Sequence, residues 1–270
     1  MRSRDGAGRT ALVTGASAGI GEAIAEVFAA HGFDLVLTAR RIDRLQDLAD
    51  RLVKLHGVGT RVLPADLADA RAPAALVSQL DMEGVSIDAL VNNAALDPKF
   101  DRANAGKHTG SFEDYPLEVW QQSLNVNLTG AFLCTQAAAP FLLSSRRGSV
   151  VNIASIYGLV GPDQRLYAQN DGQRRYKPIA YSVTKSALLG FTRYLATYWA
   201  GTGLRVNTLT LGGVETDHDY EFVRRYSERT PMGRMARPDE YGAALLFLLS
   251  EASSYMTGAN LVVDGGWTAW

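Results

Sequence analysis

A tyrosine and a lysine lie four residues apart in the segment Ala180-Tyr-Ser-Val-Thr-Lys-Ser-Ala-Leu-Leu. At this spacing Tyr181 and Lys185 share one face of a helix, so an ammonium lies beside a phenol. A free phenol has a pKa near ~10, and a neighbouring cation favours the phenolate and lowers that value. The pair therefore predicts a proton donor and acceptor suited to neutral pH. The two residues alone also fit a plain surface pair.

A glycine-rich turn near the N-terminus has the context that a dinucleotide site requires. The turn, Thr14-Gly-Ala-Ser-Ala-Gly-Ile-Gly, follows the apolar run Ala11-Leu12-Val13 and precedes apolar residues at helical spacing. Glycines let the backbone approach a pyrophosphate closely, and a helix N-terminus offers free N–H groups and partial positive charge. A tight strand-to-helix turn without a ligand is the alternative.

Further motifs follow in order, and together they resemble the short-chain dehydrogenase/reductase family. They are Asp66, Asn92-Asn93-Ala94, Asn127 in Asn-Val-Asn-Leu-Thr-Gly, Ser155 at the end of Val-Asn-Ile-Ala-Ser, Arg237-Pro238, and Asp264-Gly265-Gly266. The resemblance covers roughly Arg9 to Trp267. It implies a Rossmann-type fold and hydride transfer between a nicotinamide and a carbon that bears a hydroxyl or ketone oxygen.

The resemblance also implies roles for single residues. Tyr181 exchanges the proton, Lys185 lowers the phenol pKa and holds the nicotinamide ribose, Ser155 hydrogen-bonds the substrate oxygen, and Asn127 holds a relay water. The expected cofactor contacts are Gly15, Ser17, Gly19, Ile20, Gly21, Arg40, Asp66, Leu67, Asn93, Ala94, Tyr181, Lys185, Gly212, Val214 and Thr216. Asp66 resembles the residue that bonds the adenine amino group, and Asn92 resembles one near the adenine-side ribose.

Structural alternatives remain open for four of these residues. Asp66 also fits a helix N-cap, and Asn92 and Ser155 also fit turns at strand ends. Asn127 also fits a solvent-facing position in a helix, with Asn125 as the nearest mis-assignment.

The end of the second strand favours NADP(H) over NAD(H). In dinucleotide folds an acidic residue often bonds the ribose 2′-hydroxyl there. Ala39 stands at that place, followed by Arg40 and Arg41, and a guanidinium suits a phosphate. We expect Arg40 to contact the 2′-phosphate. Arg41 fits a solvated residue at the start of the helix equally well. NAD remains possible.

The chain departs from the family pattern at three places. Ala95 replaces a usual glycine, and Leu211-Gly-Gly replaces the usual Pro-Gly, which leaves the rigidity of the loop beside the nicotinamide open. The stretch Gly161–Pro178 makes the separation of Ser155 and Tyr181 longer than usual.

The inserted stretch bears on the substrate. It is rich in hydrogen-bonding side chains and poor in aliphatic ones, which suits a polyhydroxylated ligand better than an acyl chain or steroid. Arg174, Arg175 and Lys177 are candidates for a phosphate or carboxylate. A solvated or subunit-contacting loop is the alternative. The segment Ile156-Tyr157-Gly158, followed by Asp163 and Tyr167, loosely resembles a branch associated with sugar and surface-polysaccharide metabolism. We expect a carbohydrate substrate, with reduction of a 3-oxoacyl thioester or another small carbonyl as an alternative and a non-catalytic dinucleotide sensor as a remote one.

Alternating strand-like and helix-like runs predict one α/β domain over residues 1–270, with residues 1–9 flexible. Near-continuous apolar strands separated by helices indicate a doubly wound parallel sheet of about seven strands, covered on both faces. The candidate strands are Thr10–Thr14, Asp34–Thr38, Arg61–Pro64, Asp88–Asn92, Ser149–Ile153, Arg205–Leu211 and Asn260–Val263; the candidate helices span residues 20–31, 41–56, 70–80, 116–145, 180–201 and 238–250.

Composition narrows the function classes. With 27 basic and 28 acidic residues, nothing predicts a nucleic-acid or membrane surface, and no apolar run approaches the ~20 residues of a membrane helix. The single Cys134 is expected in the core, and the four histidines lack metal-ligand spacing. The compartment expected by default is the cytoplasm. The family resemblance implies a homo-oligomer, a tetramer or dimer, with Phe247, Leu248, Leu249 and Trp267–Trp270 at an interface or in the core.

Overall fold

The apolar runs form one parallel seven-stranded sheet in the order β3-β2-β1-β4-β5-β6-β7. The computed structural model describes residues 6–97, 111–167, 175–216 and 218–270. The predicted fold class is confirmed, and four strands have the predicted bounds. The strands are β1 (Thr10–Thr14), β2 (Asp34–Thr38), β3 (Thr60–Val62), β4 (Ala89–Asn92), β5 (Ser149–Ser155), β6 (Arg205–Leu211) and β7 (Asn260–Val263).

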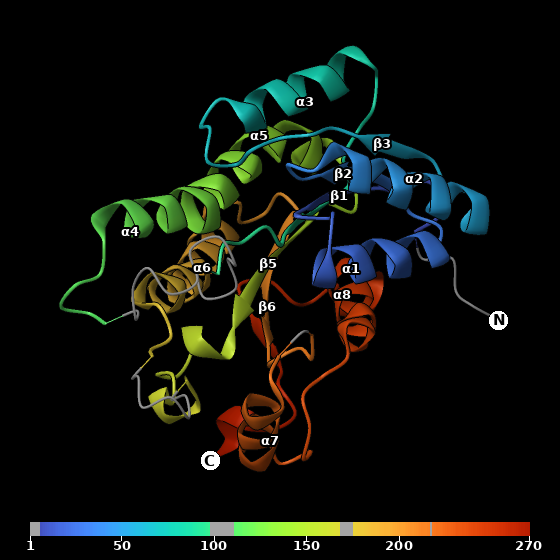
Figure 1. Cartoon of the computed structure of the whole chain (residues 1–270). Coiled ribbons are helices and arrows are strands. Elements are labelled where there is room, and N and C mark those ends of the chain that lie inside the picture. The colour runs from blue at the N-terminus through green and yellow to red at the C-terminus, as the bar shows by residue number, and fades with distance from the viewer. Residues whose placement is uncertain (1–5, 98–110, 168–174, 217) are drawn as a thin grey trace.

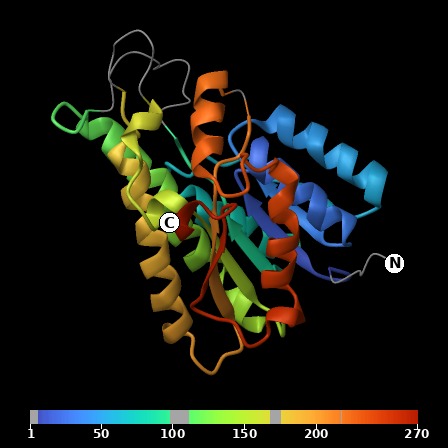
Figure 2. The ribbon, with the colours of Figure 1, turned by 90° about the horizontal axis from the view of Figure 1, so that it is seen from below.

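Helices cover both faces of this sheet (Figures 1 and 2). One face carries α1, α2 and α8, and the other carries α3, α5 and α6. The order of the strands changes direction between β1 and β4, because β2 and β3 lie on one side of this pair and β5, β6 and β7 lie on the other. The helices are α1 (Gly19–Ala30), α2 (Ile42–His56), α3 (Ala72–Met82), α4 (Leu117–Leu124), α5 (Gly130–Ser144), α6 (Ile179–Tyr198), α7 (Tyr220–Arg229) and α8 (Gly242–Leu249).

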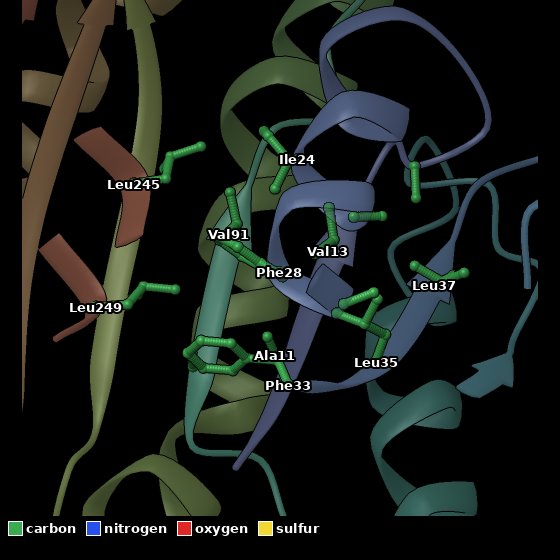
Figure 3. Packing of buried hydrophobic residues seen from close by; sticks show 14 of the residues in the cluster. Ala11, Val13, Ile24, Phe28, Phe33, Leu35, Leu37, Val91, Leu245 and Leu249 are labelled. Atoms are coloured by element: carbon green, nitrogen blue, oxygen red, sulfur yellow. The ribbon is translucent and has the colours of Figure 1, made fainter. Parts of the chain in front are cut away.

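Each face has its own hydrophobic core. Figure 3 shows the first, where Ile24 and Phe28 of α1 pack over Val13 and Val91, and Leu245 and Leu249 of α8 approach from the side. The second core joins α3, α5 and α6 to the opposite face and includes Cys134, which is buried as predicted. At the carboxyl edge of the sheet, four strands end in polar residues: Thr14, Thr38, Asn92 and Ser155.

Two helical features differ from the prediction. The helix expected over residues 116–145 contains a π-helical segment, Asn125–Thr129, between α4 and α5. The helix α7 was not predicted, because only two of its residues, Phe222 and Tyr226, are buried and the rest are largely charged. Asp219 caps α7 by accepting a hydrogen bond from the Phe222 N–H.

The stretch Leu117–Ser144 corrects one expectation from composition. This stretch of 28 residues contains an 18-residue window with a mean hydropathy of 1.4, so by length and composition alone it could span a membrane. In the fold, however, Cys134, Ala138 and Leu142 of this stretch are buried against the sheet and α3. We therefore assign it to the core of the domain.

The first residues of the described chain pack against the domain. Gly6 and Arg9 fall within the stretch expected to be flexible, yet both are buried. The Arg9 guanidinium donates hydrogen bonds to the Leu249 carbonyl at 2.7 Å and the Arg147 carbonyl at 3.0 Å. Residues 1–5 lie outside the described residues.

Candidate active site

A cleft of about 1430 Å³ runs along the carboxyl edge of the sheet. Parallel sheets bind ligands at this edge, where the winding reverses. All the expected cofactor contacts line the cleft, together with Ser155, Tyr181 and Lys185. Asn127 and Asn92 do not line it; both are buried beneath it.

The glycine turn is held rigidly at the end of β1. Gly15 has a φ of 70°, and its N–H donates a hydrogen bond to the Thr38 carbonyl at 2.8 Å. A Cβ on Gly15 would lie 2.8 Å from the Cα of Ala94, so no other residue fits without displacing β4. The Asn93 side chain also donates to the Thr14 carbonyl at 2.9 Å. Asn93 therefore joins the turn to β4.

The residues at the start of α1 fit a dinucleotide. Ala18 precedes the helix without capping it through a side chain, so the first N–H groups are available to an anion. A Cβ on Gly19 would meet no atom within 4 Å, which leaves open space over this turn. Both features match the backbone cradle that a pyrophosphate occupies.

The two arginines after β2 differ in their contacts. Arg41 donates a hydrogen bond to the Ser17 hydroxyl at 3.1 Å and so belongs to the glycine turn, rather than being only a solvated residue. Arg40 is exposed on the cleft wall, and no hydrogen bond or ion pair links it to the rest of the described chain. Arg40 is the cation available to a ligand here.

Asp66 and Asn92 correct two of the structural interpretations. Asp66 accepts a hydrogen bond from the Ala68 N–H at 3.0 Å and lines the cleft; it does not cap α3, which begins six residues later at Ala72. Asn92 points into the core, where its amide donates to Thr135 and Asn152, each at 2.9 Å. Asn92 is therefore neither a turn former nor a cleft residue.

Ser155, Tyr181 and Lys185 are brought together by β5 and α6. Ser155 ends β5, and its side chain hydrogen-bonds Tyr181, which lies near the start of α6. Lys185 lies one helical turn further and donates to the Ile153 carbonyl at 2.7 Å. Its ammonium is 5.8 Å from the centre of the Tyr181 ring. The predicted pairing on one helix face is confirmed.

Burial and nearby charges govern the titration of this group. Burial raises the pKa of Tyr181, and the Asp97 carboxylate raises that pKa further, while the hydrogen bond with Ser155 lowers it. Burial lowers the pKa of Lys185 to about 8, with Asp97 opposing the change and Lys177 adding to it. Asp97, which lies outside the expected set, therefore acts on both groups, and Lys177 acts on Lys185.

Asn127 lies beneath the cleft in the π-helical segment. It is buried, so the solvent-facing interpretation is wrong, whereas Asn125 is exposed. Its amide nitrogen donates to the Leu96 carbonyl at 3.0 Å and to the Thr184 hydroxyl at 3.2 Å. Asn127 thus connects α4–α5 to the strand end of β4 and to α6, next to Lys185.

Sequence reasoning missed Asp97 and placed Lys177 only as a contact for an anion. Both line the cleft, and they form an ion pair with each other. The available signal for Asp97 was its place in the loop that leaves β4, shortly after Asn93 and Ala94. Arg174 lies outside the described residues.

The far wall of the cleft is aromatic. Tyr157 and Tyr167 share a hydrogen bond between their hydroxyls at 3.0 Å. Tyr226 of α7 accepts a hydrogen bond from the Gly213 N–H at 2.5 Å. This contact holds the Leu211-Gly-Gly loop, whose rigidity the sequence left open.

Comparisons with known proteins agree with this geometry. A family model described as Enoyl-(Acyl carrier protein) reductase matches residues 15–268. The chain is 36% identical to galactitol 2-dehydrogenase (L-tagatose-forming) of Cereibacter sphaeroides, covering 97% of this chain and 96% of the relative. It is 35% identical to 3-oxoacyl-(acyl-carrier-protein) reductase FabG of Aquifex aeolicus, covering 96% and 97%.

A solved structure gives the same result. The gluconate 5-dehydrogenase of Burkholderia cenocepacia, in complex with NADP and tartrate, superposes with a TM-score of 0.84 at 28% identity, covering 98% of this chain and 96% of the other. These matches extend over the glycine turn, the strand-end residues and the Tyr181–Lys185 pair. The chain belongs to the short-chain dehydrogenase/reductase family.

Proposed function

We propose that the protein is an NADP(H)-dependent oxidoreductase that interconverts a secondary alcohol and a ketone in a carbohydrate or polyol. The observation that carries this proposal is the meeting of Ser155, Tyr181 and Lys185 in the same cleft as the glycine turn. A dinucleotide sensor would need the glycine turn alone.

In the proposed mechanism the protein positions the substrate and moves one proton. The bound nicotinamide supplies the hydride chemistry. The Ser155 hydroxyl donates to the substrate oxygen and stabilises the charge that develops there. The Tyr181 hydroxyl gives a proton to that oxygen during reduction and takes one during oxidation. Lys185 would hold the ribose of a bound nicotinamide, and Asn127 would support the water that returns protons.

Replacing the phenol tests this assignment. We expect Tyr181→Phe to lower kcat by at least about 100-fold, the scale of a lost general acid, while the Kd for NADPH changes little. Tyr255→Phe is the matched control, because Tyr255 is fully exposed and does not line the cleft. Near wild-type turnover by Tyr181→Phe would refute the mechanism. NADPH binding without turnover of any alcohol or ketone would favour the sensor.

The cofactor preference is proposed from the end of β2. Arg40 is available at the cleft wall and no carboxylate replaces Ala39, which supports NADP(H) over NAD(H). We expect Arg40→Ala to weaken NADPH about 10- to 100-fold through loss of a charged hydrogen bond, with NADH unchanged. Arg41→Ala should weaken both cofactors, because Arg41 supports Ser17. An NAD preference that Arg40→Ala leaves unchanged would reject the proposal.

The substrate class is proposed from the polar composition of the stretch Gly161–Pro178 and from the names of the relatives. Galactitol and gluconate dehydrogenases are among the similar proteins, as is a thioester reductase. A panel of polyols, aldonates, sugar phosphates and 3-oxoacyl thioesters, assayed with both cofactors, separates these classes. We expect turnover of polyols or aldonates; activity confined to thioesters would refute the carbohydrate class.

We also propose a cytoplasmic homo-oligomer, a tetramer or dimer. Phe132 on α5 and Tyr194 and Tyr198 on α6 are more than two-fifths exposed, and such neighbouring apolar side chains suit an interface. Leu248, Leu249 and Trp267 are buried in the core, which leaves Phe247 and Trp270 as the interface candidates near the C-terminus. Light scattering during gel filtration tests the assembly, and a monomer at micromolar concentration would contradict it.

A further inference from the structure

A second lysine lies closer to the Tyr181 ring than the motif lysine does. The Lys177 ammonium is 3.9 Å from the centre of that ring, against 5.8 Å for Lys185. Only 4% of the Lys177 side chain is exposed. A cation over an aromatic face, shielded from water, interacts strongly with the ring. Two buried cations therefore lie near the Tyr181 ring.

Lys177 is held in this place from two sides. Its ammonium forms an ion pair with Asp97, and its backbone N–H donates to the Gln164 side chain at 2.9 Å. Asp97 in turn follows Leu96, which Asn127 fixes through its backbone. The inserted stretch between Ser155 and Tyr181 thus places the positive charge of Lys177 beside the phenol. The loop after β4 places the negative charge of Asp97 beside Lys177.

The countercharge also acts on the phenol. One Asp97 oxygen pairs with Lys177, and the other is buried without a hydrogen-bond partner in the described chain. The charge of such a poorly solvated carboxylate is weakly screened and acts over a longer distance. The Asp97 carboxylate raises the pKa of Tyr181. Among residues 6–97, 111–167, 175–216 and 218–270, the remaining titratable groups that face Tyr181 are Lys185 on its own helix and the Tyr157 and Tyr167 hydroxyls.

We propose that Lys177 and Asp97 are an opposed pair of electrostatic positioning residues that set the proton affinity of Tyr181. The negative charge of a phenolate spreads into its ring, so the Lys177 ammonium over the ring face stabilises the phenolate more than the phenol. The Asp97 carboxylate stabilises the phenol instead. This inference rests on the proposed role of Tyr181 as the proton donor and acceptor.

Because Lys177 and Asp97 carry opposite charges, removing each charge should shift the pH profile in the opposite direction. We expect Lys177→Met to move the midpoint of the pH profile of kcat/KM for alcohol oxidation upward by about one pH unit, the lower end of the effect of a close charge. Asp97→Asn should move it downward by a similar amount. The double variant should return close to the wild-type midpoint. A merely structural role would lower activity without moving the midpoint in either direction.

Two further variants keep the test decisive. Lys177→Arg retains a cation that stacks on an aromatic ring and should keep the wild-type midpoint. Lys54→Met, at an exposed position of α2, removes a lysine remote from the cleft and should change nothing. Shifts of the same sign in Lys177→Met and Asp97→Asn, or no shift in either, would overturn the proposal.

A readout without turnover separates this proposal from the proposed function. The ultraviolet absorbance of tyrosinate, measured against the matching Tyr181→Phe protein for each variant, reports the ionisation of Tyr181 directly. The same opposed shifts should appear there. If no alcohol or ketone is turned over but these shifts are present, the oxidoreductase proposal fails and the electrostatic pair stands. If turnover is present and the absorbance midpoints coincide, the pair is rejected.

Discussion

The side chain of Asn127 pairs with the backbone of Leu96 on both edges of its amide. The Leu96 N–H donates to Oδ1 at 2.7 Å, and Nδ2 donates to the Leu96 carbonyl at 3.0 Å. Asn127 reaches this position because the chain is π-helical there, and such segments recur at functional sites. The contact fixes the loop that carries Asp97 into the cleft.

Asn127→Ala should therefore weaken both the fold and the site. Removing the side chain leaves the Leu96 N–H and carbonyl without their partner in a partly buried place, which costs about 1–3 kcal/mol of unfolding free energy. We expect kcat to fall with it, because the loop that carries Asp97 loses its anchor. Urea unfolding and steady-state kinetics measure the two effects.

The same experiment has a control two residues away. Asn125→Ala changes an exposed residue of the same segment and should stay within about 0.5 kcal/mol of the wild type. Equal effects of the two substitutions on stability and kcat would contradict a stabilising role of the hydrogen bonds between Asn127 and Leu96.

Gly19 and Gly21 should respond differently to alanine. A Cβ on Gly21 would lie 2.2 Å from the Gly15 carbonyl oxygen, so Gly21→Ala forces the turn apart and should cost about 3 kcal/mol or more. A Cβ on Gly19 meets no atom, although its φ of 58° costs an alanine about 1 kcal/mol. We expect Gly19→Ala to fold and to lose most of its NADPH affinity, because the methyl group fills the space over the helix N-terminus.

Thermal unfolding with and without NADPH distinguishes the two glycine variants. Gly19→Ala should show a nearly normal Tm and little stabilisation by NADPH, whereas Gly21→Ala should show a strongly lowered Tm. Full NADPH stabilisation of Gly19→Ala would contradict a pyrophosphate position at this turn.

The sequence predicted the elements whose residues interact locally. The runs that became β1, β2, β6 and β7 each contain at least two leucine or valine residues, and the glycine turn and the Tyr181–Lys185 spacing are local patterns. The contact of Asp97 with Lys177 joins two loops that are distant along the chain, so no spacing rule predicts it. Asn92 illustrates the same limit, since its inward orientation depends on Thr135 and Asn152. The place of Asn92 in the Asn92-Asn93-Ala94 motif did not show that its side chain points into the core.

Acid should selectively remove the stabilisation supplied by Asp163. This carboxylate binds Arg165 at 2.7 Å and Arg229 of α7 at 2.9 Å, so it fastens the inserted stretch to a helix. The hydrogen bond with Arg165 is the main cause that lowers the pKa of Asp163 from 3.8 to about 2. The folded protein thus binds the proton more weakly than the unfolded chain, and the contribution is complete above pH ~4 and lost as the pH falls toward 2.

Asp163→Asn should cost about 1 kcal/mol at neutral pH, a modest value because Arg165 is largely exposed to solvent. The difference between the two proteins should shrink as the pH falls from about 4 to about 2. Urea unfolding at a series of pH values measures it. A difference that stays constant over this range would assign the loss to packing and not to charge.

Lys185 should make NADPH binding depend on pH in the alkaline range. Burial lowers its pKa from 10.5 to about 8, so the side chain is an ammonium below that pH and a neutral amine above it. An ammonium is the stronger hydrogen-bond donor, and charged hydrogen bonds exceed neutral ones by about 1 kcal/mol or more. We expect NADPH affinity to fall several-fold as the pH rises through 8.

The Lys185→Met protein should bind NADPH more weakly and should not show this pH-dependent decrease in affinity. Fluorescence titration of NADPH at each pH measures both proteins; a step that persists in Lys185→Met would belong to another group and would separate Lys185 from the cofactor.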